Sequence, residues 1–317
     1  MLSDREVDFA KKIKVLKEQK NAVILAHYYV RPEIQDIADY VGDSLGLSQK
    51  AAETTADIIV FAGVNFMAET AKILSPGKKV LLPDLEAGCS LAESIPAPDF
   101  GEFKKQYPEH LVITYVNTTA EIKSMSDICC TSSNARQIVE SLPETQKIIF
   151  APDKNLGNYI NSVTGRQMVL WQGQCHVHDE FSLEGILGLK KQYPEAKIVA
   201  HPECQKPILL VADYVGSTSE LLKYTSTDSC AEYIVVTESG ILHKMKEKSP
   251  GKQFYPAPSE NPNCMCADCN FMKLNTLEKL YNCLEKETPE ILIEEEVRVK
   301  ALKPIQKMLE ISERLGI

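Results

Sequence analysis

The sequence predicts an α/β protein made of three α/β/α three-layer repeats, each with a short parallel sheet, related by pseudo-threefold symmetry around a central site. Three observations predict this fold. Three apolar strand-like runs end in a similar way, two further strands follow each run at similar spacing, and a distinctive cysteine follows each third strand. Helix-like segments separate the strands, which indicates parallel pairing.

The first strand of each expected repeat is followed by two polar side chains at positions i and i+2. Such positions face the same side of a strand. The strands are 22–26, 111–114 and 197–200, and the polar pairs are His27 with Tyr29, Tyr115 with Asn117, and His201 with Glu203. Ligands of parallel α/β sheets bind at the carboxyl ends of the strands, so these six residues are candidate site residues.

The second and third strands extend the repetition. Second strands are expected at 57–61, 127–130 and 232–236, and third strands end at Pro83, Pro152 and Pro256. The spacing from the acidic residue that opens the second strand to that proline is 26, 25 and 24 residues. The middle copy is about 18 residues shorter between its first two strands. The alternative is a single doubly wound sheet without internal symmetry.

These spacings divide the chain into repeats at 1–88, 89–174 and 175–273. Residues 274–317 form two amphipathic helices divided near Pro289, and we expect them to pack on the first repeat.

Composition excludes several functional classes. The formal charge is −9 and the pI is about 5.3, which argues against a protein that coats nucleic acid or an anionic membrane. The first 29 residues contain no uncharged apolar run that suits a signal peptide or a membrane span, so we expect a cytoplasmic protein. In that reducing compartment, ten cysteines do not predict a disulfide framework.

The cysteines that follow the third strands are candidate metal ligands. They are Cys89, Cys175 and a group of three, Cys264, Cys266 and Cys269. Three thiolates brought together by the repeats would leave one metal position of a cubane cluster open for substrate. The competing interpretation is a local zinc or redox site made by the last three cysteines, with His243 as a remote fourth ligand. The repetition favours the cluster.

Nine phrases in order resemble the quinolinate synthase family over nearly the whole chain. They are Ala26-His-Tyr-Tyr29, Gly42-Asp-Ser44, Tyr115-Val-Asn-Thr118, Cys130-Thr-Ser-Ser-Asn134, Gly173-Gln-Cys-His-Val-His178, His201-Pro-Glu-Cys204, Gly216-Ser-Thr218, Thr237-Glu-Ser-Gly240 and Cys269-Asn-Phe-Met-Lys273. The resemblance implies a pseudo-threefold fold and a [4Fe–4S] cluster held by Cys89, Cys175 and Cys269. It also implies the condensation of iminoaspartate with dihydroxyacetone phosphate to quinolinate, with loss of phosphate and two waters. Many members carry Cys-x-x-Cys-x-x-Cys where this chain has Cys-x-Cys-x-x-Cys, which leaves open a regulatory disulfide between the spare thiols.

The resemblance assigns the general base and its assisting residues, and side-chain chemistry suggests roles for the other polar residues. Glu203 is expected to be the general base, assisted by Tyr29 and His201, and His27 is a further titratable group. Tyr115 and Asn117 are suited to orienting carboxylates or carbonyls. Hydroxyls on loops that open helices are expected to hold anionic groups, because helix N-termini present free N–H groups; they are Ser44, Ser132, Ser217 and Thr218.

The expected partners are the two small substrates, with neither nucleic acid nor a membrane. Transient contact with an aspartate oxidase or dehydrogenase that supplies the unstable iminoaspartate is a further expectation. Three other functions compete with this one. They are a cluster-dependent hydro-lyase of the aconitase type, a redox sensor or cluster carrier that uses the spare cysteines, and a zinc-stabilised α/β binding protein.

Overall fold

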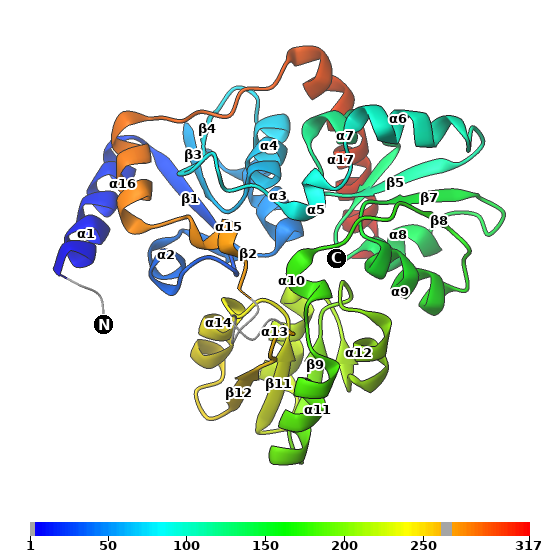
Figure 1. Ribbon diagram of the computed structural model, residues 1–317. Coiled ribbons are helices and arrows are strands. Elements are labelled where there is room, and N and C mark those ends of the chain that lie inside the picture. The colour runs from blue at the N-terminus through cyan, green and yellow to red at the C-terminus, as the bar shows by residue number, and fades with distance from the viewer. Residues whose placement is uncertain (1–3, 261–267) are drawn as a thin grey trace.

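The computed structural model describes residues 4–260 and 268–317. In this part of the chain the strands form three separate four-stranded sheets, all parallel, with helices around each of them (Figure 1). The three sheets lie in three lobes whose inner ends meet at the centre of the molecule. The predicted fold class is confirmed.

Each repeat begins with a helix and then alternates strands and helices. The first contains α1 (Asp4–Gln19), β1 (Ala22–His27), α2 (Pro32–Ile37), β2 (Tyr40–Gly42), α3 (Ser44–Glu53), β3 (Ile58–Ala62), α4 (Asn65–Leu74), β4 (Lys79–Leu81) and α5 (Ser90–Glu93). The second contains α6 (Ala97–Lys105), β5 (Leu111–Tyr115), α7 (Ala120–Ser124), β6 (Ile128–Cys130), α8 (Ala135–Glu140), β7 (Ile148–Ala151), α9 (Lys154–Thr164), β8 (Val169–Leu170) and α10 (His176–Asp179). The third contains α11 (Leu183–Gln192), β9 (Lys197–Ala200), α12 (Lys206–Val211), β10 (Tyr214–Val215), α13 (Thr218–Thr227), β11 (Glu232–Val236), α14 (Ile241–Lys248), β12 (Gln253–Pro256) and α15 (Asn270–Lys273). The chain ends with α16 (Leu277–Lys286) and α17 (Glu295–Leu315).

The three sheets share one strand order. It is β2-β1-β3-β4 in the first repeat, β6-β5-β7-β8 in the second and β10-β9-β11-β12 in the third. In each sheet, the third strand in this order begins at a nearly constant number of residues after the second. β3 begins 36 residues after β1, β7 begins 37 after β5, and β11 begins 35 after β9. These central strands are apolar and mostly buried, as expected for strands covered on both faces.

The predicted matching of strands in the middle repeat was wrong by one strand. The run at 127–130 was matched with β3 and β11, but it forms the edge strand β6, the counterpart of β2 and β10. The true counterpart is β7, so the middle repeat is not shortened. The error arose because β2 and β10 are only three and two residues long and leave no pattern in the sequence. Each repeat therefore has four strands, and each cysteine loop follows the fourth.

A repeated aspartate ties the edge strand to the first strand in all three sheets. The carboxylates of Asp39, Asp127 and Asp213 accept hydrogen bonds of 2.7–2.8 Å from backbone N–H groups 15 residues earlier, those of Ile24, Val112 and Ile198. The backbone N–H of each aspartate in turn donates to the carbonyl of that same residue. This reciprocal pair fixes the register of a strand too short to hold it alone.

The C-terminal helices cover two repeats, not only the first as expected. Helix α16 packs on α1 in the first repeat, whereas α17 packs mainly on α7 and β6 in the second. Figure 1 shows α17 beside the second lobe, with the chain crossing over from α16. The proposed boundaries at residues 88, 174 and 273 stay predictions.

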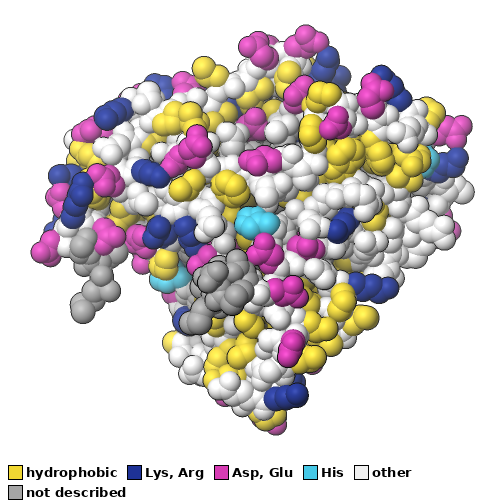
Figure 2. Space-filling model, viewed as in Figure 1, with side chains coloured by type: hydrophobic (Ala, Val, Ile, Leu, Met, Phe, Trp, Pro, Cys, Tyr) yellow, Lys and Arg dark blue, Asp and Glu magenta, His cyan; other side chains and the backbone are white. Residues whose placement is uncertain are grey.

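The visible surface carries charges of both signs, and the described helices do not suit a membrane span. Figure 2 shows acidic and basic side chains interspersed over the visible face. Among residues 4–260 and 268–317, every helix is too short or too polar to cross a membrane.

Candidate active site

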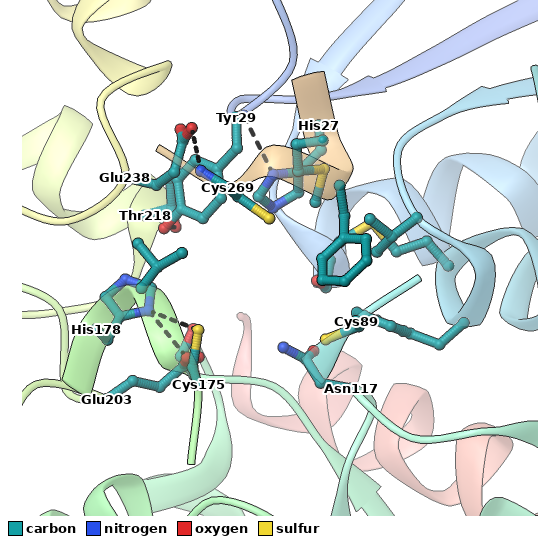
Figure 3. A pocket seen from close by; sticks show the side chains of 18 of the residues that line it. His27, Tyr29, Cys89, Asn117, Cys175, His178, Glu203, Thr218, Glu238 and Cys269 are labelled. Carbon is teal, nitrogen blue, oxygen red and sulfur yellow. Dashed lines mark hydrogen bonds and ion pairs between the residues drawn. The ribbon is translucent and has the colours of Figure 1, made fainter. Parts of the chain in front are cut away.

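A pocket lies where the carboxyl ends of the three sheets meet (Figure 3). All but one of the predicted site residues line it: His27, Tyr29, Ser44, Cys89, Tyr115, Asn117, Ser132, Cys175, His201, Glu203, Thr218 and Cys269. Residues from all three repeats therefore form one site. The exception is Ser217, which is fully buried and is not among the lining residues.

The three cysteines occupy equivalent positions. Cys89, Cys175 and Cys269 each stand at the N-cap of a one-turn helix, α5, α10 and α15, at the end of the loop that follows the fourth strand of a repeat. Figure 3 shows the three sulfur atoms directed toward one open space. Burial raises the pKa of Cys89 to about 12 and that of Cys269 to about 11, and it raises the pKa of Cys175 as well. Without a bound cation the thiols stay protonated.

Two of the three cysteines of the alternative zinc site, Cys264 and Cys266, lie outside the described residues. His243, the remote fourth ligand of that interpretation, is paired with Asp36 at 2.6 Å (Nε2 to Oδ1). It does not line the central pocket.

Two histidines occupy matching places in the first and third repeats. Nδ1 of His27 accepts a hydrogen bond from the backbone N–H of Tyr29, and Nδ1 of His201 accepts one from Glu203, each two residues along the chain. Burial lowers the pKa of His27 to about 4 and that of His201 to about 3. Both imidazoles are therefore neutral with the proton on Nε2, so each can donate a hydrogen bond.

Glu203 is a buried carboxylate that its neighbours hold ionised in the pocket. Its Oε1 accepts a 2.6 Å hydrogen bond from the Tyr115 hydroxyl, and its Oε2 lies 3.1 Å from Nδ1 of His178. Burial opposes ionisation of Glu203, but the nearby His178 and His201 and the hydrogen bonds from His178 and Tyr115 outweigh it and lower its pKa to about 2. Such a carboxylate, 2% exposed, is positioned to accept a proton from a bound molecule.

A chain of hydroxyl groups connects the first repeat to the third. The Tyr29 hydroxyl lies 2.9 Å from Thr218 Oγ1 and 2.7 Å from Thr237 Oγ1. Thr237 Oγ1 lies 3.0 Å from Nε2 of His178, whose Nδ1 lies 3.3 Å from the sulfur of Cys175. Donor atoms of Cys175, His178 and Glu203 lie within 4.8 Å of one another, so they also form a candidate metal-binding group.

The predicted hydroxyl residues occupy three kinds of position. Ser44 and Thr218 are the first residues of α3 and α13, helices of ten residues whose N-termini face the pocket. Ser132 lies 3.2 Å from Nε2 of His201. The hydroxyl of Ser217 accepts a hydrogen bond from Glu220 in a capping box, which engages it within α13.

Asn117 presents an unsatisfied acceptor. Its Oδ1 is buried and finds no hydrogen-bond donor among the described residues. A buried amide oxygen without a partner costs about 1–3 kcal/mol, so a ligand with a donor group at this point would relieve that cost.

Sequence reasoning assigned no definite role to two residues of this site, His178 and Glu238. His178 follows Cys175 by three residues, a place that suits either tuning of a bound metal or packing. Glu238, whose carboxylate pairs with Lys273 at 2.7 Å, was not considered beyond its strand end. The signal for Glu238 was its place after β11, where parallel α/β sheets put their ligand-binding residues.

Comparisons with known proteins find relatives along nearly the whole chain. Residues 11–310 match the family described as Quinolinate synthetase A protein. The chain is 60% identical over 306 residues to a quinolinate synthase of Thermosynechococcus vestitus, with 96% of both chains covered. It is 61% identical over 305 residues to one of Synechocystis sp., again with 96% of both covered. A quinolinate synthase of Chloroherpeton thalassium is 57% identical over 307 residues, covering 97% of this chain and 95% of that one.

Proposed function

The chain belongs to the quinolinate synthetase A family and is a condensing enzyme that forms quinolinate. On that premise we propose that it condenses iminoaspartate with dihydroxyacetone phosphate, releasing phosphate and two waters, in the biosynthesis of NAD. We further propose a [4Fe–4S] cluster held by Cys89, Cys175 and Cys269. The observation that carries the proposal is the meeting of three equivalent cysteines with a buried, ionised Glu203 in one pocket.

The donor set fits such a cluster. The thiols come from equivalent loops of the three repeats, and soft thiolates are the ligands that iron–sulfur clusters require. Three cysteine ligands leave one iron open, and that iron would supply a Lewis acid for a substrate carboxylate or hydroxyl. The other pocket residues are neutral or acidic donors and acceptors that can surround a bound substrate.

Proton transfer is assigned to the residues around Glu203. Its carboxylate accepts a proton from the substrate carbon or nitrogen, and the neutral His201 and His27 donate hydrogen bonds from Nε2 to developing negative charge on oxygen. Tyr29, whose burial raises its pKa well above the usual value, stays protonated and acts as a hydrogen-bond donor. Tyr115 holds the Glu203 carboxylate in place.

Anion binding is assigned to the helix N-termini and to Asn117. The phosphate and carboxylates of the substrates would lie against the first turns of α3 and α13, close to Ser44 and Thr218. Ser132 and Asn117 would orient the remaining polar groups. Ser217 would contribute only through its cap on α13. Cytoplasmic location and transient contact with an aspartate oxidase or dehydrogenase stay predictions.

The test is anaerobic purification followed by iron and sulfide analysis and a quinolinate assay with both substrates. Wild type is expected to contain about four irons and four sulfides per chain, and Cys89→Ser, Cys175→Ser and Cys269→Ser to lose most of both. Cys230→Ser is the matched control, because Cys230 lies outside the pocket. A colourless zinc protein, or iron retained in Cys89→Ser and Cys175→Ser, would overturn the cluster proposal.

The assay also separates the competing functions. A hydro-lyase of the aconitase type would turn over without a phosphate ester, whereas the proposed reaction requires dihydroxyacetone phosphate. A redox sensor or cluster carrier would tolerate Glu203→Gln, which the proposed reaction does not.

A further inference from the structure

Two of the three cysteine loops are held by a buried carboxylate of their own repeat. The backbone N–H of Cys175 donates to Oδ2 of Asp153 at 3.2 Å, and the backbone N–H of Cys269 donates to Oε1 of Glu238, also at 3.2 Å. Asp153 and Glu238 are 0% and 1% exposed. Figure 3 shows Glu238 beside Cys269 with this contact drawn.

The two carboxylates occupy the same place in their repeats. Asp153 stands two residues after the end of β7, and Glu238 stands two residues after the end of β11. The corresponding position in the first repeat, two residues after β3, is Val64, which is buried and offers no acceptor. The loop that leads to Cys89 is instead tied through the backbone, by the Asn65 N–H to the Ala87 carbonyl at 2.8 Å.

Each carboxylate is fixed by a second contact, so it forms a rigid anchor. Oδ1 of Asp153 accepts a 2.7 Å hydrogen bond from the backbone N–H of Leu156. Oε2 of Glu238 accepts one of 2.7 Å from Gly240, and Lys273 pairs with its other oxygen. A carboxyl group that accepts hydrogen bonds at both oxygens has a fixed position, so it also fixes the backbone of the cysteine whose N–H donates to it.

We propose that Asp153 and Glu238 are positioning residues that hold Cys175 and Cys269 as metal ligands, whereas Cys89 is held without a carboxylate. This inference rests on the proposed function, since it assumes that the three thiols bind a cluster. Partners of this kind, which touch a ligand residue and not the metal, typically change metal affinity by about 10–100-fold when removed.

The test measures how fast the cluster loses iron to a chelator under anaerobic conditions. Asp153→Ala and Glu238→Ala are expected to release iron about 10–100-fold faster than wild type. Asp153→Asn and Glu238→Gln keep one acceptor oxygen for the cysteine N–H but replace the second acceptor by an N–H donor, so their release rates are expected to lie between those of wild type and the alanine variants. The matched control is Asp43→Ala, because Asp43 caps a helix at the pocket by accepting from Gly46 at 3.0 Å, as Asp153 caps α9, but it holds no cysteine.

The outcomes separate the inference from the proposed function. If wild type holds the cluster and both alanine variants release iron at the wild-type rate, the positioning role is wrong and the proposed function stands. Release that is equally fast in Asp43→Ala would also overturn it, because loss of a helix cap would then be the cause. If wild type binds no iron through the three cysteines, the proposed function fails first.

A second variant keeps the test decisive if an alanine variant does not fold. Glu238→Asp keeps a carboxyl group but withdraws it by one methylene from the Cys269 N–H. This variant is expected to release iron faster than Glu238→Gln. The opposite order would contradict a role that depends on a side chain long enough to accept from the Cys269 N–H. Circular dichroism of each variant confirms that the fold is retained.

Discussion

The Tyr115 hydroxyl, from the second repeat, donates a 2.6 Å hydrogen bond to the Glu203 carboxylate, from the third. The bond joins two repeats, and both of its residues line the proposed active site. A hydrogen bond to an ionised acceptor is roughly twice as strong as a neutral one, so this pair couples the geometry of two repeats to the ionisation of one carboxylate.

Glu203→Gln removes the proposed base while it keeps the shape of the side chain. We expect kcat to fall by about 10²–10⁴-fold, the usual contribution of a general base, with the pocket intact. Steady-state quinolinate formation checks this, with iron content measured in parallel. A variant that keeps its iron and full activity would show that another group takes the proton.

Tyr115→Phe tests the hydrogen bond itself. Loss of the donor raises the pKa of Glu203, so the acidic limb of the pH–rate profile should move to higher pH, and kcat should fall about tenfold, a smaller effect than that of Glu203→Gln. Tyr193→Phe is the control, because Tyr193 stacks on Tyr255 away from the pocket and should leave the profile unchanged. An unmoved acidic limb in Tyr115→Phe would contradict this assignment.

The hydroxyl chain between Tyr29 and His178 predicts coupled mutations. Tyr29→Phe and Thr237→Val each break the same chain, so the second change should cost less once the first is present. A double-mutant cycle on kcat/KM is expected to give a coupling energy above about 0.5 kcal/mol. Additive effects would mean that the two hydroxyls act separately.

Ser312 fixes α17 to the second repeat. Its hydroxyl accepts a 3.0 Å hydrogen bond from the buried Asn134 side chain, whose oxygen is engaged by Thr131. Ser312→Ala leaves the Asn134 N–H without that acceptor, so we expect a loss of about 1–3 kcal/mol in the free energy of unfolding. Urea denaturation measures it, with exposed Ser226→Ala as a control that should change little.

Glu287 gives a pH-dependent contribution to stability. It ends α16 and pairs with Lys20 and Lys79, both at 2.6 Å, and these hydrogen bonds lower its pKa to about 2. Because the folded pKa lies below the usual 4.5, the stabilisation is complete above pH 4.5 and is lost as pH falls toward 2.

Glu287→Gln isolates that charge, since it keeps the length of the side chain. The variant should melt below wild type at pH 7, and the difference should shrink on going to pH 3.5 and in 1 M salt. Thermal melts at both pH values check this. A difference that grows at low pH would show that the carboxylate is not ion-paired in the folded state.

The sequence alone could predict the repeats and the site because their residues lie at strand ends, where spacing along the chain carries over into space. The cysteines at 89, 175 and 269 lie in loops after strands, the pairs at 27/29, 115/117 and 201/203 lie at or just after strand ends, and all of them line the pocket. The two-residue and three-residue edge strands could not be found in this way, since periodicity needs more residues than they contain. The aspartates that fix them are exposed and look like ordinary loop residues.

Other features depended on packing that no local pattern encodes. Whether α17 covers the first or the second repeat is decided by tertiary contacts, because an amphipathic helix fits either apolar surface. The assignment of Ser217 as an anion ligand assumed a free hydroxyl, but Glu220 three residues later forms a capping box with it. That Ser-x-x-Glu spacing was visible in the sequence.

The distribution of one thiol to each repeat has a consequence for how the protein matures. Cys89 and Cys175 are separated by 86 residues, and Cys175 and Cys269 by 94. During synthesis, the three-thiol pocket is therefore incomplete until nearly the whole chain has left the ribosome and the third lobe has folded against the other two. Loading of the proposed cluster would therefore follow folding, and a chain truncated before Cys269 would never gain the full set of sulfur donors.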